Sequence, residues 1–282
     1  MKNIVVIYHD DLDGFCSALS ARRKFRNKAE YIGVTHNSHT PLPEGLVERE
    51  IYLFDFCYEK PIMENLLSRN KKLVVIDHHV SEKETIKIST EHIYGENNSA
   101  SVLAWKYFNP KKPVPRILKY IEDMDYFRFK LPNSKAVFAF LDSFVFDFKI
   151  FDKLFADFEN NSKLQSFVKE GRAILRYKEN WVKIIAAQAE EVDFFGNRAF
   201  AVNSPILESE IGNYLHETRG GVAIIWRFTE NRFRVSLRSS GDPDVSKLAQ
   251  KFEAGGGHKQ AAGFMFDAEM NFPWTRKNGK SH

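Results

Sequence analysis

Three short apolar runs early in the chain each lead directly into acidic or imidazole side chains. The runs span residues 4–8, 51–54 and 73–76, and the polar residues that follow them are His9, Asp11 and Asp13, then Asp55, and then Asp77, His78 and His79. Short β-branched runs with polar boundaries are typical of buried parallel strands. In open α/β sheets, ligand sites form at the carboxyl ends of such strands. We therefore expect an α/β fold whose sheet gathers these side chains along one edge.

Each of these residues, taken alone, has a structural explanation. An aspartate before a helix is commonly an N-cap, and one in a turn commonly closes it. Several carboxylates held together, however, repel one another and raise one another's pKa, so the cluster is unfavourable unless a cation neutralises it. Carboxylate oxygens and imidazole nitrogens without a thiolate suit a hard or borderline divalent cation. The pattern therefore predicts a metal site and favours a metal-dependent hydrolase.

The chain is long enough for two domains. It has 282 residues, and its hydrophobic content of 43%, with 25 Phe, is sufficient for two buried cores. The net charge of +4 neither requires nor excludes a polyanionic partner. Cys16 and Cys57 lack the spacing of a disulfide framework, which favours a reducing compartment. No apolar stretch resembles a signal peptide or approaches the roughly 18 to 20 residues of a membrane span, so we expect a cytoplasmic protein that does not enter membranes.

Strand and helix signals alternate in the first part of the chain and change in the last third. The signals predict strands at 3–8, 30–34, 51–55 and 72–77, a helix at 59–69, and mainly helical structure over 134–189 that includes a long proline-free segment. Further along they predict strands at 200–202, 222–228 and 233–237, a hairpin turn at 230–232, and short helices at 208–217 and 244–252. We expect residues 1–189 to form a mainly parallel sheet with helices on both faces. A long helix then links this domain to a smaller α/β domain with a mixed sheet, residues 190–282.

A glycine run in the second domain is a candidate anion site. Gly255, Gly256 and Gly257 precede His258, and consecutive glycine N–H groups can form an anion-binding nest. Arg238, at the end of a predicted strand, has the planar guanidinium that grips a phosphate in two places. These residues therefore predict a subsite for a phosphate-bearing substrate.

The order of these motifs resembles that of the DHH phosphoesterase superfamily, in its oligoribonuclease and RecJ-like branch. The motifs, from residue 4 to about residue 265, are His-Asp-Asp-Leu-Asp-Gly at 9–14, Asp55, Asp-His-His at 77–79, Glu-Asp-Met-Asp at 122–125 and Gly-Gly-Gly-His-Lys-Gln-Ala-Ala-Gly at 255–263. The resemblance implies a metal-binding catalytic DHH domain over residues 1–189 and a DHH-associated, substrate-binding domain over residues 190–282.

The resemblance also implies a site with two Mn²⁺ ions, for which Mg²⁺ or Co²⁺ are possible substitutes. It assigns Asp13, Asp55, His78 and Asp123 to one ion and His9, Asp11 and Asp55 to the other, with Asp55 bridging. The fourth motif offers both Asp123 and Asp125, and we expect Asp123 to be the ligand. His79 is expected to face the substrate phosphate and Asp77 to orient a ligand imidazole. Arg238, His258 and the three glycines are expected to hold the part of the substrate that is not cleaved.

These features favour a manganese-dependent phosphodiesterase that hydrolyses short single-stranded oligonucleotides or dinucleotides to nucleoside monophosphates. Two cations clamp the phosphoryl group and activate a water for attack. The alternatives are a phosphatase for cyclic dinucleotides or nucleoside bisphosphates, and a module that senses nucleotides without hydrolysing them. We expect a monomer or a homodimer.

Overall fold

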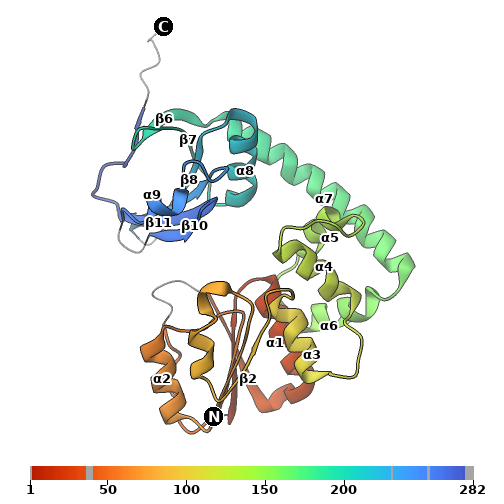
Figure 1. The fold of residues 1–282 in the computed structure, drawn as a ribbon. Helices are drawn as coiled ribbons and strands as arrows, with labels where there is room; N and C mark the ends of the chain where they lie inside the picture. The colour runs from red at the N-terminus through yellow and green to blue at the C-terminus, as the bar shows by residue number, and fades with distance from the viewer. Residues whose placement is uncertain (1, 36–40, 230, 253–254, 277–282) are drawn as a thin grey trace. The chain divides into compact units, whose positions relative to one another are not determined.

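The computed structural model describes residues 2–35, 41–229, 231–252 and 255–276, and within them the chain forms two compact units. The first unit runs to Leu175 and the second begins at Arg176, so the division falls inside the longest helix, α7 (Asn161–Ala187). The two units are described separately below, and Figure 1 shows the elements of each. Among the helices of the described residues, none combines the length and apolar character needed to cross a membrane.

The first unit contains an all-parallel sheet. In spatial order its strands are β2 (Ala29–Val34), β1 (Ile4–His9), β3 (Glu50–Phe54), β4 (Lys72–Asp77) and β5 (Glu91–Tyr94). The four strands predicted from the sequence are confirmed. The sequence analysis missed β5, a four-residue strand that pairs with β4 at the sheet edge.

Helices cover both faces of this sheet because its central strands are apolar on both sides. Val5 and Ile7 point into a core shared with α2 (Lys60–Arg69), whereas Val6 and Tyr8 face the core that contains α1 (Leu12–Phe25). Figure 1 shows α2 on one side of the sheet and α1 with α3 on the other. The remaining elements of the unit are η1 (Arg26–Lys28), η2 (Val80–Glu82), η3 (Thr85–Ile88), α3 (Ala100–Phe108), α4 (Arg116–Asp125), α5 (Ser134–Leu141) and α6 (Phe148–Asp157).

The second unit is built on a mixed sheet. Its order is β10 (Gly256–His258), β11 (Ala261–Asp267), β9 (Arg232–Arg238), β8 (Val222–Thr229), β7 (Asn197–Asn203), β6 (Glu190–Phe194) and β12 (Thr275–Arg276). Only β7 and β8 pair in parallel among the described strands of this sheet. The predicted hairpin is present as the antiparallel β8–β9 pair, although Glu230 in its turn lies outside the described residues. The predicted α/β class, with a parallel and a mixed sheet, is therefore confirmed.

Two helices pack on opposite faces of the mixed sheet. One face packs against α9 (Val245–Ala249), and the other packs against α8 (Glu208–Arg219). Val182 and Ala186, near the end of α7, join the core on the α8 side. The second unit therefore takes up the last part of this helix, which the sequence analysis assigned to the first domain.

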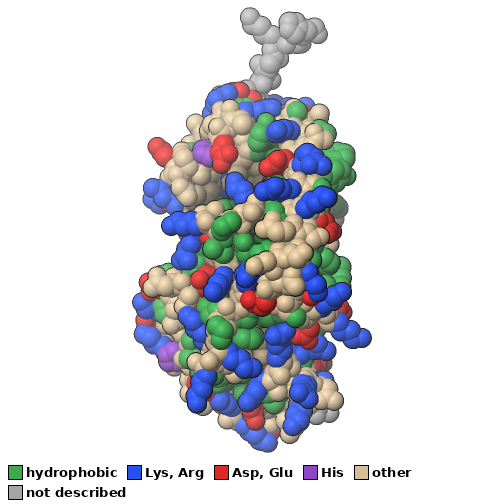
Figure 2. Space-filling view, turned by 90° about the vertical axis from the view of Figure 1, so that its right-hand side faces the viewer, with side chains coloured by type: hydrophobic (Ala, Val, Ile, Leu, Met, Phe, Trp, Pro, Cys, Tyr) green, Lys and Arg blue, Asp and Glu red, His purple; other side chains and the backbone are tan. Residues whose placement is uncertain are grey.

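Basic side chains are distributed widely over the face of the molecule drawn in Figure 2, and acidic side chains lie among them. This mixture agrees with the small net charge of +4.

Phe15 is central to the core that holds α1 against the sheet. Its side chain is fully buried and lies against the rings of Tyr8, Phe148 and Phe151 at centroid distances of 6.1, 4.7 and 5.0 Å. Replacing Phe15 by Ala removes these contacts and leaves a cavity, so we expect a loss of about 3–5 kcal/mol in the free energy of unfolding. Urea denaturation measures it. Val145→Ala, at a side chain 75% exposed, is the control and is expected to change stability by less than about 0.5 kcal/mol. Equal stability of both variants would contradict this account of the core.

Candidate metal centre

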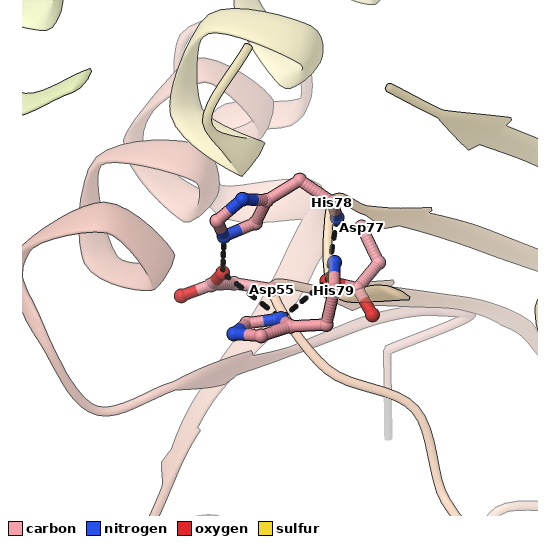
Figure 3. Close-up of side chains that lie close together, drawn as sticks. All are labelled: Asp55, Asp77, His78 and His79. Atoms are coloured by element: carbon pink, nitrogen blue, oxygen red, sulfur yellow. Dashed lines mark hydrogen bonds and ion pairs between the residues drawn. The ribbon is translucent and has the colours of Figure 1, made fainter. Parts of the chain in front are cut away.

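The carboxyl ends of β1, β3 and β4 bring together the acidic and imidazole residues that follow them in sequence. Asp55 lies at the centre and is 3% exposed. Its Oδ1 lies 3.3 Å from Nε2 of His78 and 4.0 Å from Nδ1 of His79, and its Oδ2 lies 3.6 Å from Nδ1 of His9. Figure 3 shows the imidazoles of His78 and His79 on either side of the Asp55 carboxylate. The predicted gathering of these residues at one sheet edge is therefore present in the structure.

The backbone of Asp55 helps to place this carboxylate. Its N–H donates to the carbonyl of Ile76 at 2.9 Å, and its φ of 66° is in the left-handed region. Aspartate adopts this region more readily than most residues with a Cβ. The chain therefore turns sharply at the end of β3, directly at the site.

The first turn of α1 supplies two more carboxylates. Asp11 is the N-cap of α1: its Oδ1 accepts from the N–H of Gly14 at 2.9 Å, and its Oδ2 lies 2.8 Å from Nδ1 of His9. Asp13 is 2% exposed, and its Oδ1 accepts from the N–H of Ser101 at the start of α3. A Cβ on Gly14 would lie 2.2 Å from the carbonyl oxygen of His9, so only glycine lets α1 start this close to β1.

The fourth predicted motif contributes Asp125 to this cluster, and the structure does not bring Asp123 into it. Oδ2 of Asp125 lies 3.5 Å from Nε2 of His78, and Asp13, His78 and Asp125 form one potential cation-binding group. Asp123 instead accepts from the backbone N–H groups of Lys130 and Leu131, at 2.9 and 3.1 Å. The expectation for Asp123 is corrected because its carboxylate holds the loop that follows α4.

Tyr126 fixes the imidazole of His78, and the sequence analysis missed this residue. The Tyr126 hydroxyl donates to the carbonyl of Glu96 at 3.0 Å, so its oxygen accepts from Nδ1–H of His78 at 3.1 Å. With the proton on Nδ1, the Nε2 lone pair of His78 points toward Asp55 and Asp125 and is free to bind a cation. The only sequence signal for this role is that Tyr126 directly follows a candidate ligand.

Asp77 is fully buried and orients His79 rather than His78. Its Oδ1 contacts Nδ1 of His79 at 2.8 Å and accepts from the N–H of His78 at 2.7 Å. Burial alone would lower the pKa of His79, but the hydrogen bond to Asp77 raises it overall. The His79 side chain is 43% exposed, so its Nε2 is accessible to a ligand.

The electrostatics of the cluster reflect its crowding. Burial and the charge of Asp13 raise the pKa of Asp125 to about 8, and the same two causes raise the pKa of Asp55 well above its usual range. Burial alone would lower the pKa of His9, but its hydrogen bonds to Asp11 and Asp55 raise it to about 10. Without a cation, this cluster therefore keeps protons on some of its carboxyl and imidazole groups.

The donor atoms fit a divalent cation. Five buried atoms of the cluster have no hydrogen-bond partner among the described residues: Asp13 Oδ2, Asp55 Oδ1, Asp77 Oδ2, His78 Nε2 and Asp125 Oδ2. Potential ligand atoms within 4.8 Å of one another also form three overlapping groups: Asp55, Asp77, His78 and His79; His9, Asp11 and Asp55; and Asp13, His78 and Asp125. Buried oxygens and an imidazole nitrogen without hydrogen-bond partners are unfavourable when no cation is bound. The same atoms are suitable ligands for a divalent cation.

In the second unit, Arg238 and His258 lie on the same face of the mixed sheet. Both pair in register with Ala261 of β11, so they lie in one row across three strands, about 10 Å apart along the row. The Arg238 guanidinium donates to Ser209 Oγ at 2.8 Å and to the carbonyl of Leu237, and burial lowers its pKa. His258 is exposed.

The glycine run has packing roles in addition to any role in ligand binding. A Cβ on Gly255 would lie 1.9 Å from the carbonyl oxygen of Ala249, and the Gly255 N–H donates to the carbonyl of Phe252. Gly257, at φ 133°, would place a Cβ 2.6 Å from the backbone of Ala262. Gly256 has open space where its side chain would be. The glycines therefore bring β10 close to β11, beside Arg238 and His258.

Known proteins are similar to this chain in both units. Residues 194–275 match the DHHA1 domain family. The DHH domain of PF0399, which belongs to a family of ribosomal proteins, superposes with a TM-score of 0.58 at 15% identity, covering 93% of this chain and 82% of that one. The second unit therefore matches the DHHA1 family, and the fold of the chain is similar to that of a DHH-domain protein. Both findings agree with the family resemblance found in the sequence.

Two further solved structures share the fold over nearly the whole of this chain, and one curated protein is similar in sequence. PggH from Vibrio cholerae, a pGpG-specific phosphodiesterase, has a TM-score of 0.52 at 15% identity and covers 95% of this chain and 94% of its own. RecJ from Thermus thermophilus, in complex with Mn²⁺, has a TM-score of 0.53 at 13% identity and covers 94% of this chain and 49% of its own. Protein R106 of Acanthamoeba polyphaga mimivirus, which is uncharacterized, is 28% identical over 287 residues, covering 93% of this chain and 67% of R106.

The two aspartates of the fourth motif give a matched test of the site. Asp125→Asn is expected to weaken Mn²⁺ binding at least about 10- to 100-fold, because it removes a charge beside His78. Asp123→Asn is expected to leave Mn²⁺ affinity within a few-fold and to lower stability by about 1–3 kcal/mol, because it weakens the hydrogen bonds to Lys130 and Leu131. Titration calorimetry with Mn²⁺ and thermal unfolding measure the two effects. The reverse pattern would restore Asp123 as the ligand.

The role of Tyr126 is tested by removing its hydroxyl. Tyr126→Phe leaves Nδ1–H of His78 without its acceptor, so we expect Mn²⁺ affinity to fall about 10- to 100-fold. Nitrogen-15 chemical shifts of the His78 ring report whether the proton still resides on Nδ1. Tyr94→Phe is the matched control, since the Tyr94 hydroxyl contacts the Glu96 carboxylate and not a histidine. Unchanged affinity and an unchanged His78 tautomer in Tyr126→Phe would show that the hydroxyl has no such role.

Proposed function

We propose that this protein is a divalent-metal-dependent phosphodiesterase that hydrolyses dinucleotides or short single-stranded oligonucleotides to nucleoside monophosphates. The observation that carries the proposal is the set of five buried donor atoms that lack hydrogen-bond partners among the described residues, in the first turn of α1 and at the ends of β3, β4 and α4. Such a set is unfavourable in a protein that binds no cation there. Every candidate donor in these groups is a carboxylate or an imidazole.

Two cations fit the donor groups. In this proposal Asp13, Asp55, His78 and Asp125 would hold one ion, and His9, Asp11 and Asp55 would hold the other, so that Asp55 would serve both. Mn²⁺ suits this mixed set, while Mg²⁺ prefers oxygen ligands alone and Co²⁺ is a further possible substitute. When bound, such ions stabilise charge on the phosphoryl oxygens and make a water acidic enough to attack phosphorus.

His79 is the proposed contact from the protein to the scissile phosphate. Asp77 accepts from Nδ1–H of His79, so the accessible Nε2 is directed away from Asp77. With both ring nitrogens protonated, Nε2–H donates a hydrogen bond to a non-bridging oxygen. This bond becomes stronger as negative charge develops on that oxygen during attack. Hydrolysis adds water across the phosphodiester: the new P–O bond forms to the water oxygen, and the bond to the leaving nucleoside oxygen breaks.

The second unit is the proposed holder of the rest of the substrate. Arg238 and His258 present side-chain donors on one face of the sheet, beside the glycines Gly255, Gly256 and Gly257, and such donors suit a terminal phosphate. The specificity of the structural neighbour PggH for pGpG supports a linear dinucleotide as the substrate. The binding of Mn²⁺ by RecJ supports manganese as the metal. The cysteines, Cys16 and Cys57, are free and buried, which fits the reducing cytoplasm proposed for the protein.

A substrate panel tests this function. With Mn²⁺, linear dinucleotides are expected to be hydrolysed faster than longer RNA or DNA, cyclic dinucleotides and nucleoside bisphosphates. His79→Ala is expected to lower kcat about 10²- to 10³-fold because it removes a donor to the developing charge. His92→Ala, at an exposed histidine of β5, is the matched control and is expected to keep full activity. Fastest turnover of cyclic dinucleotides or bisphosphates would assign the alternative phosphatase function. Nucleotide binding without turnover would identify a sensor.

A further inference from the structure

A short loop after α4 exposes aromatic and basic side chains beside the candidate metal centre. The Phe127 side chain is 70% exposed, Arg128 and Lys130 are also partly or fully exposed, and Phe129 is half-buried. The exposed ring of Phe127 therefore contributes little to the hydrophobic core.

The backbone holds Phe127 in a position that glycine usually occupies. The N–H of Phe127 donates to the carbonyl of Met124 at 2.7 Å, and the N–H of Arg128 donates to the carbonyl of Asp123 at 2.8 Å. This pair of bonds is the Schellman motif that ends a helix, with Phe127 at the left-handed residue. Its φ is 50°, and Phe129 has a φ of 46°. Both residues therefore bear the strain that a Cβ causes in this region.

Burial of the Phe127 side chain offsets little of this strain, because the side chain is 70% exposed. Its ring contact is an edge-to-face pair with Phe129 at 6.1 Å between centroids, and most of its surface remains in solvent. The loop is nevertheless well anchored, because the Asp123 carboxylate accepts from Lys130 and Leu131. The structure thus fixes an exposed phenyl ring in a strained conformation, which is a pattern found at binding sites.

The loop directly follows, in the sequence, residues that belong to the candidate metal centre. Asp125 and Tyr126, which contact His78, immediately precede Phe127. The Arg128 guanidinium lies 4.2 Å from the centre of the Tyr126 ring, and that ring centre lies 5.4 Å from the centre of the His78 ring. Taken together, these two distances place Arg128 within about 10 Å of the His78 imidazole. Arg128 is therefore close enough to the candidate metal centre to contact a substrate bound there.

We propose that Phe127 and Arg128 form a nucleobase subsite for the substrate whose phosphodiester occupies the metal centre. Phe127 supplies the stacking face, and Arg128 supplies positive charge for the adjoining phosphate or for the face of the base. This inference rests on the proposed phosphodiesterase function and deepens it. Every base has an aromatic face, so stacking on Phe127 selects an unpaired nucleotide without selecting its sequence. A double-stranded substrate cannot present its bases to this ring.

Substitution by glycine separates binding from stability. Phe127→Gly removes the ring and also relieves the strain, so this variant is expected to unfold at the same temperature as the wild type or higher. Phe195→Gly is the matched control. Phe195, in the turn between β6 and β7, has a φ of 52° and is 44% exposed, but it belongs to the second unit and packs against Phe252. Phe127→Trp keeps an aromatic face and serves as the conservative replacement.

The ligand for the test is a dinucleotide with 2-aminopurine as one base and a methylene group in place of the scissile bridging oxygen. It binds without being cleaved, and stacking quenches its fluorescence. In the presence of Mn²⁺, Phe127→Gly is expected to bind it about tenfold or more weakly, with loss of quenching at one of the two base positions. Phe195→Gly and Phe127→Trp are expected to bind and quench like the wild type.

The outcomes distinguish this inference from the proposed function. Equal affinity and quenching in the wild type and Phe127→Gly, at both base positions, would overturn the subsite and leave the phosphodiesterase proposal intact. Equal weakening of binding to an analogue that lacks both bases would also overturn it, because the loss would then not come from stacking. A wild type that neither binds nor hydrolyses dinucleotides would overturn the proposed function itself, and the subsite with it.

Discussion

The repulsion among carboxylates around Asp55 is the constraint on which the first unit depends. Asp11, Asp13 and Asp125 lie around the same small volume, and burial removes the water that would otherwise screen their charges. The parallel sheet makes this arrangement possible because its strands end at one edge and its hydrophobic core is provided elsewhere, on both faces. The sheet thus provides the rigidity, and a cation supplies the charge that the protein lacks at this edge.

A second layer of polar contacts orients the donors before a cation binds. Tyr126 sets the tautomer of His78, Asp77 sets the direction of His79, and the backbone of Ser101 fixes one oxygen of Asp13. Each partner is itself held by regular structure: the Tyr126 hydroxyl by a backbone carbonyl, Asp77 by β4, and Ser101 by α3. The ligand side chains are therefore preorganised, which lowers the cost of assembling the site.

The sequence predicted the four strands β1 to β4 of the parallel sheet and most of the cluster, because both depend on local patterns. Asp55, Asp77 and His78 come at or directly after the ends of apolar runs, and this pattern alone places them at the carboxyl edge of the sheet. The choice between Asp123 and Asp125 was different. Residues two apart are separated by about 200° around the helix axis, so their side chains point in nearly opposite directions. Which of them faces the site depends on how α4 packs, and this is a tertiary property. The strand β10 was missed for a related reason, since a glycine-rich segment carries no alternating pattern.

The last turn of α4 joins several parts of the first unit in a single rigid piece. The Glu122 carboxylate accepts from the N–H of Ser99 and from the amide of Asn98, at the start of α3, while Asp123 holds the exposed loop and Asp125 faces His78. Ile121, fully buried, anchors this turn in the core. A small rotation of the helix about its axis would shift all of these groups together. A substitution that changes the packing beneath α4, far from any ligand atom, would therefore move these groups together. Such a substitution is expected to change the turnover rate.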